Sequence, residues 1–170
     1  GTIRFESQKD VGTTYYITIP FKRDLEGRAQ AENTPINEKQ SLNGMSVLLA
    51  EDNELNMEIA QFFLENAGAV VTPVWNGQEA LEAFQETGDG TYDAILMDIM
   101  MPVLDGYQAT QAIRALPRPD AKKVPILAMT ANAFAEDRKR AMQAGMNEHL
   151  AKPIQAEVLV DTLMKYKKEV

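Results

Sequence analysis

The chain has 170 residues, of which 45% are hydrophobic and 25% charged, a balance typical of a globular protein. Its formal net charge of -8 argues against a nucleic-acid-binding surface, which needs clustered lysine and arginine. It has no cysteine and a single histidine, His149, so disulfides, cysteine-based zinc sites and multi-histidine metal sites are excluded.

The first 21 residues differ in pattern from the rest of the chain. The runs TIRFES (2–7) and TTYYITIP (13–20) are rich in β-branched and aromatic residues, and the turn-like QKDVG separates them. This pattern predicts a β-hairpin over residues 1–21. Residues 22–43 are polar and poor in large apolar side chains, which indicates a linker, with a fixed surface segment as the alternative.

From Gly44 to Val170, short apolar runs alternate with segments of helical periodicity. Strands are predicted at 45–50, 69–75, 93–98, 124–131 and 148–153, and helices at 53–68, 77–87, 106–116, 135–145 and 155–169. This alternation predicts an α/β fold with a doubly wound, five-stranded parallel sheet covered by helices on both faces. The expected form is flavodoxin-like, with strand order 2-1-3-4-5.

The apolar faces of three helices are also predicted from the spacing of their side chains. The inward residues are expected to be Leu55, Ile59, Phe62 and Phe63 in the first helix, Ala80, Leu81 and Phe84 in the second, and Val158, Leu159, Leu163 and Tyr166 in the last.

Polar residues stand where four of the five predicted strands end. Glu51 and Asp52 follow the first strand, Asp98 ends the third, Thr130 the fourth and Lys152 the fifth. Because the carboxyl ends of parallel strands meet at one edge of a sheet, these side chains are expected to converge. Three carboxylates repel one another unless a cation lies among them, and Mg²⁺ accepts such oxygen ligands.

Asp98 is the candidate for chemistry, because apolar residues both precede and follow it in the segment DAILMDIMMP (93–102). A buried charge costs several kcal/mol unless it is paired, so its position indicates a site that needs an anion. A carboxylate can attack phosphorus and form an aspartyl phosphate, and phosphoryl transfer needs cations and hydrogen-bond donors around the moving group. Mg²⁺, Lys152 and Thr130 supply them.

Residues 44–170 resemble the receiver domain of two-component response regulators, through the segments VLLAEDNELN, DAILMDIMMPVLDGY, ILAMTANA and GMNEHLAKPI. The resemblance implies that Asp98 is the phosphoacceptor. It also implies that Mg²⁺ is held by Asp98, by Asp52 directly, by Glu51 through water and by the backbone carbonyl of Met100.

The same resemblance gives roles to three further residues. Thr130 is the expected switch hydroxyl that moves toward the phosphoryl group, and Lys152 is expected to pair with Asp98 or its phosphate. His149 stands where the family usually has a Tyr or Phe that rotates on activation. A histidine switch is therefore expected, without the usual coupling between threonine and tyrosine.

Residues 1–20 resemble the closing hairpin of a histidine-kinase ATP-binding domain. The order hairpin, linker, receiver implies a parent that is a hybrid sensor histidine kinase, with this chain as its C-terminal part. The chain lacks ATP-binding motifs, so we expect it to have no kinase activity of its own. Self-dephosphorylation of the receiver is also expected. The expected partners are a histidine-phosphorylated kinase domain and a histidine phosphotransfer protein, with no nucleic acid and no direct membrane contact.

No apolar run approaches the roughly 20 residues of a membrane helix. A cytoplasmic location is expected, whether or not the parent is membrane-anchored.

Three rival functions remain open from the sequence. An aspartate-nucleophile phosphatase needs a second acid two residues after Asp98, and Met100 stands there. A flavodoxin-like cofactor binder needs a phosphate-binding loop after the first strand, where the chain has the acidic EDNELN. A degenerate receiver that signals by binding alone would not need the acids and the lysine that are present.

Overall fold

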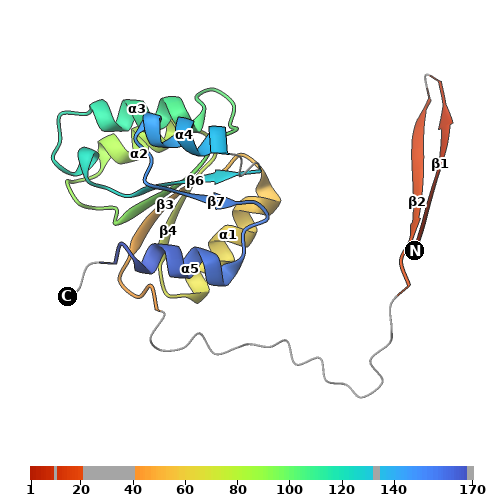
Figure 1. Ribbon diagram of the computed structural model, residues 1–170, viewed down its shortest axis with the longest axis horizontal. Coiled ribbons are helices and arrows are strands. Elements are labelled where there is room, and N and C mark those ends of the chain that lie inside the picture. Colours follow the sequence, from red (N-terminus) through yellow and green to blue (C-terminus); the bar gives the residue numbers. More distant parts are fainter. Residues whose placement is uncertain (10, 21–40, 132–134, 168–170) are drawn as a thin grey trace, which may run out of the picture. The chain divides into compact units, whose positions relative to one another are not determined.

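The computed structural model describes residues 1–9, 11–20, 41–131 and 135–167, and the chain divides into two units, Gly1–Thr34 and Pro35–Val170 (Figure 1). Each unit is described by itself. Of the predicted linker, residues 22–40 lie outside the described residues, so its assignment stays a prediction, as do the domain boundaries.

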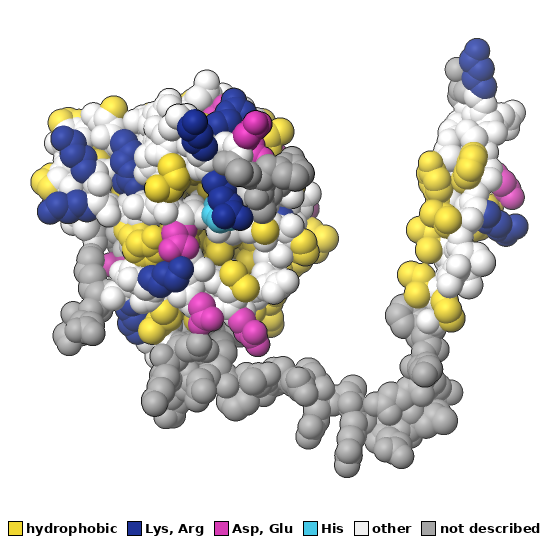
Figure 2. All heavy atoms as spheres, in the orientation of Figure 1, with side chains coloured by type: hydrophobic (Ala, Val, Ile, Leu, Met, Phe, Trp, Pro, Cys, Tyr) yellow, Lys and Arg dark blue, Asp and Glu magenta, His cyan; other side chains and the backbone are white. Residues whose placement is uncertain are grey.

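The first unit contains the predicted hairpin, formed by antiparallel strands β1 (Thr2–Gln8) and β2 (Gly12–Thr18). Alternation of side chains divides it into an apolar side and a mixed side, which Figure 2 shows in different colours. The cross-strand pairs Ile3–Ile17 and Phe5–Tyr15 share the apolar side, and Arg4–Tyr16 and Glu6–Thr14 the other. Every residue of both strands is exposed.

The second unit is built on a five-stranded parallel sheet. Its strands are β3 (Ser46–Ala50), β4 (Val70–Val74), β5 (Ala94–Asp98), β6 (Ile126–Thr130) and β7 (Glu148–Ala151). Their order, β4-β3-β5-β6-β7, is the 2-1-3-4-5 order expected from the sequence. All residues of β5 and β6 are buried, which agrees with their continuous apolar sequences.

Helices cover both faces of this sheet, as predicted (Figure 1). They are α1 (Glu54–Asn66), α2 (Gly77–Glu86), α3 (Gly106–Ala115), α4 (Ala135–Ala144) and α5 (Ala156–Met164), with a short unpredicted 3₁₀ helix, η1 (Asp120–Lys122). Helix α1 packs beside α5 on one face, and α3 packs between α2 and α4 on the other. The sheet thereby separates two hydrophobic cores.

Polar side chains fix where the helices near the carboxyl edge of the sheet begin. Asn53 caps α1, Asn76 caps α2 and Asp105 caps α3, in each case by accepting a hydrogen bond from the backbone three residues later. The loops that follow β3, β4 and β5 therefore end at defined positions.

In helix α1, Phe63 packs against the core as predicted, but the other three residues predicted to face inward, Leu55, Ile59 and Phe62, are exposed. Its buried residues are Met57, Ala60 and Leu64, whereas Leu55 is 63% exposed and Phe62 60% exposed. The helix carries apolar side chains on both sides, so periodicity alone fits either face. The side formed by Met57, Ala60 and Leu64 is the one that packs into the core.

The other helices follow the prediction more closely. In α2, Ala80 and Phe84 are buried and Leu81 packs against the core at its edge. In α5, Leu159 and Leu163 are buried as predicted, but Val158 is exposed. The expected helix 155–169 ends at Met164; Tyr166 lies beyond it and packs against the core, and residues 168–170 lie outside the described residues.

None of the helices that the structure describes has the length and apolar character needed to cross a membrane.

Candidate functional site

The register of the sheet brings the predicted site residues to one edge. Ala50 pairs with Met97, so the next residues along β3 and β5, Glu51 and Asp98, emerge side by side. Asp98 itself pairs with Met129 on β6, immediately before Thr130. Thr130 in turn pairs with Ala151 on β7, immediately before Lys152. The expected convergence is therefore present.

Three carboxylates form the centre of this edge. Glu51, Asp52 and Asp98 each offer an oxygen that lies within 4.8 Å of the other two. Glu51 and Asp98 are only 1% and 4% exposed, whereas Asp52 is open to solvent. Two buried acids so close together need positive charge nearby.

Lys152 supplies one such charge. Its Nζ lies 2.7 Å from Asp98 Oδ2 and 2.6 Å from Glu51 Oε2. Burial acts to lower the pKa of this ammonium, but its hydrogen bonds to Asp98 and Glu51 outweigh burial and raise the pKa above its ordinary value. Lys152 is therefore a fixed cation at neutral pH.

The charge balance of the cluster matches a divalent cation. Three carboxylates and one ammonium leave a net charge of -2. The clustered donors are carboxylate oxygens without thiolate or imidazole, the set that hard cations such as Mg²⁺ prefer over soft metals. The residues present therefore fit the magnesium ion that the sequence predicts.

Backbone and amide donors orient the two buried acids. Met100 N donates to Asp98 Oδ1 at 3.2 Å. Asn56 Nδ2 donates to Glu51 Oε1 at 3.0 Å, and Asn53 N approaches the same oxygen at 3.4 Å. The contact of Asn56 was not predicted, because it joins a helix to a strand end. The only sequence signal is that Asn56 falls in the first turn of the helix that follows the acids.

The model of the response regulator receiver domain family matches residues 47–164, which is more than half of the chain. The chain belongs to this family. The match covers the whole sheet except the first residue of β3, together with all five helices, and it contains every predicted site residue.

Relatives of this receiver domain include sensor kinases from plants and bacteria. Histidine kinase 1 of Arabidopsis thaliana is 34% identical over 160 residues, which cover 76% of this chain and 13% of that protein. The sensor protein GacS of Pseudomonas syringae is 39% identical over 121 residues, which cover 71% of this chain and 13% of that protein. The chain thus spans about an eighth of the length of these relatives.

Solved receiver structures are similar in fold. The receiver domain of sensor histidine kinase PA1611 from Pseudomonas aeruginosa, described with magnesium in its active-site cleft, is 43% identical with a TM-score of 0.66 and covers 72% of this chain and 97% of that one. The Saccharomyces cerevisiae structure of the phosphotransfer protein Ypd1 with the receiver domain of Ssk1 gives 30% identity, a TM-score of 0.63 and coverage of 72% and 88%.

The remaining predicted site residues of this receiver domain are Thr130, His149 and Met100. Thr130 is the last residue of β6 and is buried. His149 lies on β7, pairs with Ala128 of β6 and is half-buried. The side chain of Met100 is exposed. The switch roles of Thr130 and His149, and the metal-ligand role of the Met100 carbonyl, stay predictions.

Proposed function

We propose that this receiver domain accepts a phosphoryl group on Asp98 from a phosphohistidine and relays it within a phosphorelay. The observation that carries the proposal is the Asp98 carboxylate itself. It is almost completely buried, lies beside two further acids and is held 2.7 Å from the Lys152 ammonium. Such an arrangement suits a nucleophile whose charge is balanced rather than removed.

The proposed step transfers the phosphoryl group from a histidine nitrogen of the donor to a carboxylate oxygen of Asp98. An oxygen of Asp98 attacks phosphorus, a P–O bond forms and the P–N bond of the phosphohistidine breaks. The electron pair of that bond stays on the departing imidazole nitrogen. The donor ring carries a proton on its other nitrogen, so it leaves as a neutral histidine, and the product on this chain is an aspartyl phosphate.

Residues of this chain would hold Mg²⁺ beside Asp98. The proposed ligands are Asp98, Asp52, Glu51 through water and the backbone carbonyl of Met100. When bound, the ion supplies charge stabilisation for the phosphoryl oxygens. The net charge of -2 in the cluster and its all-oxygen donors support this assignment.

Lys152 and Thr130 are proposed as the donors that this chain directs at the phosphoryl group. The Lys152 ammonium already contacts the attacking carboxylate, so it can bind an oxygen of the incoming group without a large movement. Thr130 ends the neighbouring strand, and its hydroxyl is proposed to donate to a second oxygen. A move of Thr130 would be passed to the β7 residue His149 and change the surface of β7 and α4.

The proposed partners are a histidine-phosphorylated kinase domain and a histidine phosphotransfer protein. Support comes from an apolar patch on α1, formed by Leu55, Ile59 and Phe62, which are exposed although they are large and hydrophobic. The helix starts directly after the acids, so a partner seated on this patch would reach Asp98. The solved complex of Ypd1 with the receiver domain of Ssk1 is such a pairing in those two proteins.

The parent is proposed to be a hybrid histidine kinase, of which residues 1–21 form the closing hairpin of the ATP-binding domain. The relatives are kinases much longer than this chain, and the exposed apolar side of the hairpin is the kind of face that a larger domain covers. A cytoplasmic location is proposed, because a kinase domain that uses ATP is the donor.

The first test is intact mass after incubation with acetyl phosphate and Mg²⁺. The chain should gain one phosphoryl group, with loss of acetate from the donor, and the gain should require Mg²⁺. The variant Asp98→Asn should show no gain. Asp105→Asn is the matched control, because Asn caps α3 as well as Asp does and labelling should persist. A gain in Asp98→Asn equal to that of the wild type rules out the assigned acceptor.

Hydrolysis of p-nitrophenyl phosphate separates the phosphatase alternative from this function. A phosphatase of this kind would turn over the ester repeatedly. The receiver should not, because Met100 stands where such enzymes place their second acid.

A further inference from the structure

Asn56 occupies an unusual position between a helix cap and the acidic cluster. Its backbone N–H donates to Asn53 Oδ1 at 3.0 Å, which closes the cap of α1. Its side-chain amide donates to Glu51 Oε1 at 3.0 Å. The backbone of Asn56 thus takes part in the cap of α1, and its side chain binds a residue of the acidic cluster.

This contact leaves Glu51 held at both carboxylate oxygens. Asn56 and, at a longer distance, Asn53 N contact Oε1, while Lys152 Nζ lies 2.6 Å from Oε2. The Glu51 side chain is almost completely buried. A glutamate has one more rotatable bond than an aspartate, so it loses more conformational freedom when fixed and gains more from a second anchor.

The neutrality of the amide matters for a site that takes a cation. A lysine or arginine at position 56 would add positive charge and compete with the metal ion. An aspartate or glutamate would face the Glu51 carboxylate as a like charge. An amide donor fixes the direction of Glu51 and leaves the net charge of the cluster at -2.

We propose that Asn56 is a positioning residue that sets the orientation in which Glu51 takes part in binding a divalent cation. The inference rests on the proposed magnesium-dependent function and adds the group that orients its second acid. Outer groups that orient metal ligands typically contribute about 10–100-fold to metal affinity, so the contact is expected to matter on that scale.

The test replaces Asn56 in the full chain and measures Mg²⁺ binding by calorimetry, without any phosphodonor. Asn56→Ala removes the amide, and Asn56→Leu keeps a similar size without a donor. Both keep the backbone N–H that closes the cap. The dissociation constant for Mg²⁺ should rise about tenfold in each variant.

Phosphorylation by acetyl phosphate gives a second readout with a distinct signature. The Mg²⁺ concentration for half-maximal labelling of Asp98 should rise by the same factor as the dissociation constant. The labelling rate at saturating Mg²⁺ should stay within about twofold of the wild type, because the hydrogen bonds of Asn56 go to Asn53 and Glu51 and not to Asp98 or Lys152. A general loss of structure would raise the half-maximal Mg²⁺ concentration and would also lower the labelling rate at saturating Mg²⁺.

Gln61→Ala is the matched control. Gln61 Nε2 donates to Glu65 Oε1 at 2.7 Å, so the same helix contains a second amide-to-carboxylate bond, exposed and further along α1. Its removal should leave the Mg²⁺ affinity unchanged. Thermal unfolding without Mg²⁺ should show that both Asn56 variants and the Gln61 variant are still folded at the temperature of the binding measurement.

A double-mutant cycle tests whether Asn56 acts through Glu51. In a Glu51→Gln background, Asn56→Ala should cause no further loss of affinity, and a persistent tenfold loss would overturn the proposed route. Wild-type binding together with unchanged affinity in Asn56→Ala would overturn this inference alone. A wild-type chain that binds no Mg²⁺ would overturn the proposed function and this inference together.

Discussion

Two glycines, each at the start of a helix, permit the backbone to pack closely against the end of β5 and the loop that follows it. A Cβ on Gly106 would lie 2.1 Å from the backbone oxygen of Asp98, and one on Gly77 would lie 2.3 Å from the oxygen of Leu104. Gly77 N also donates to that Leu104 oxygen at 3.1 Å. Both contacts involve backbone atoms, which cannot turn aside as a flexible side chain can. The position of Asp98 therefore depends on residues that have no chemistry of their own.

Gly106→Ala should destabilise the protein, although alanine is the better helix former by about 1 kcal/mol. The new methyl group must displace the end of β5, and overpacking of this kind typically costs about 1–3 kcal/mol. Urea unfolding measures the loss. Gly88→Ala is the control, since its nearest neighbour would be 3.7 Å away. Equal free energies of unfolding for the two variants would show that the end of β5 shifts without a cost in stability.

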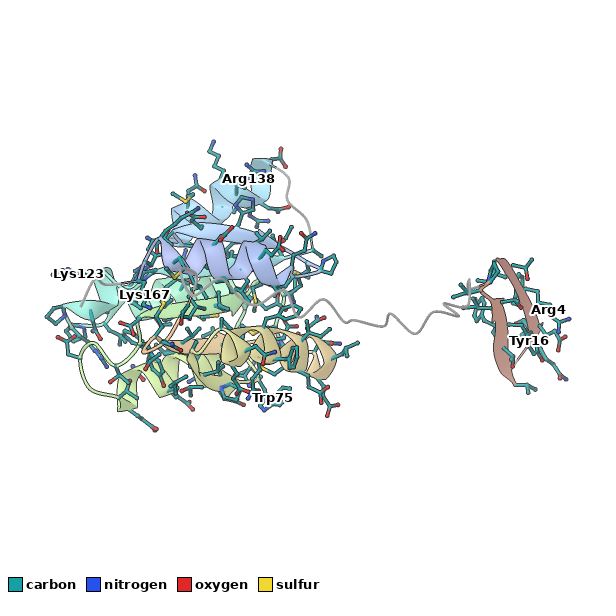
Figure 3. All side chains as sticks on the ribbon, turned by 90° about the horizontal axis from the view of Figure 1, so that it is seen from below. Arg4, Tyr16, Trp75, Lys123, Arg138 and Lys167 are labelled. Atoms are coloured by element: carbon teal, nitrogen blue, oxygen red, sulfur yellow. The ribbon has the colours of Figure 1, made fainter. Side chains whose placement is uncertain are left out.

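His149 is expected to make stability depend on pH. Burial lowers the pKa of His149, the charge of Arg138 lowers it further, and the charge of Glu148 partly opposes both effects. Arg138 is labelled on α4 in Figure 3. The unfolded histidine, with a pKa of about 6.5, therefore takes up its proton first as the pH falls. The contribution of His149 to stability is therefore fully present above the pKa of the unfolded histidine. It is lost as the pH falls through the lower pKa of the folded state.

The variant His149→Phe lacks this titration, so its free energy of unfolding should fall less between pH 7.5 and 5.5 than that of the wild type. Chemical unfolding at both pH values measures this fall in each protein. Subtracting one fall from the other removes the contribution of the other titrating groups, which the two proteins share. The same fall in both proteins would exclude a contribution from His149.

The site residues that could be predicted from the sequence are those that end strands. Glu51, Asp98 and Lys152 were found because a polar residue directly after an apolar strand marks the edge of a parallel sheet. Asn56 could not be found in this way. Its partner Glu51 is near in the sequence, but the contact depends on side-chain rotamers and on the path of the loop between them, which periodicity does not describe.

At the scale of elements, the order and type of the strands and helices followed from the sequence, but the buried face of α1 did not. Hydrophobic periodicity predicts a helix well when its two sides differ in polarity, as in α2. In α1, Leu55 and Phe62 oppose Met57 and Leu64, so both sides are apolar. Packing against the sheet selects one side and leaves the other exposed.

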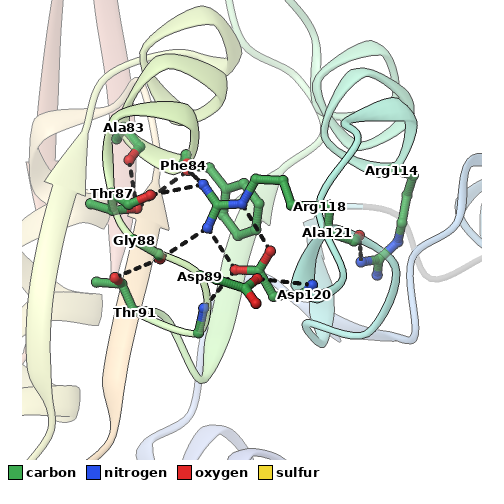
Figure 4. A network of polar contacts seen from close by, with 11 residues as sticks. Ala83, Phe84, Thr87, Gly88, Asp89, Thr91, Arg114, Arg118, Asp120 and Ala121 are labelled. Carbon is green, nitrogen blue, oxygen red and sulfur yellow. Dashed lines mark hydrogen bonds and ion pairs between the residues drawn. The ribbon is translucent and has the colours of Figure 1, made fainter.

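The connection between α2 and η1 depends on Arg118 (Figure 4). Its guanidinium donates to the backbone oxygens of Phe84, Thr87 and Gly88, and it binds both carboxylate oxygens of Asp120 at 2.7 and 2.9 Å. It also lies 4.5 Å from the centre of the Phe84 ring. The hydrogen bonds from Arg118 hold the pKa of Asp120 well below its usual range.

Arg118→Lys should lower the free energy of unfolding by about 1–2 kcal/mol, because one ammonium cannot replace a planar group that serves several acceptors at once. Thermal and urea unfolding report the change. Arg138→Lys, at an exposed position on α4, is the matched control and should be close to neutral. If both substitutions cost the same, the network around Arg118 contributes nothing specific to stability.

At the scale of the whole chain, the two units differ in how they are stabilised. Both hydrophobic cores and every proposed site residue belong to the second unit, Pro35–Val170. The described residues of the hairpin include none that is buried, and an isolated two-stranded hairpin is marginal in water. The physical basis for independent folding is therefore present in the second unit alone.

A fragment of residues 35–170 should accordingly fold cooperatively, bind Mg²⁺ with the affinity of the full chain and take up one phosphoryl group on Asp98. A peptide of residues 1–34 should show little regular structure, because its apolar side is exposed and no second layer covers it. Circular dichroism, calorimetry and intact mass measure these properties on the two fragments. A fragment 35–170 that folds but binds Mg²⁺ more than tenfold more weakly would show that the first unit contributes to the site. If it fails to fold, the two cores are not sufficient by themselves.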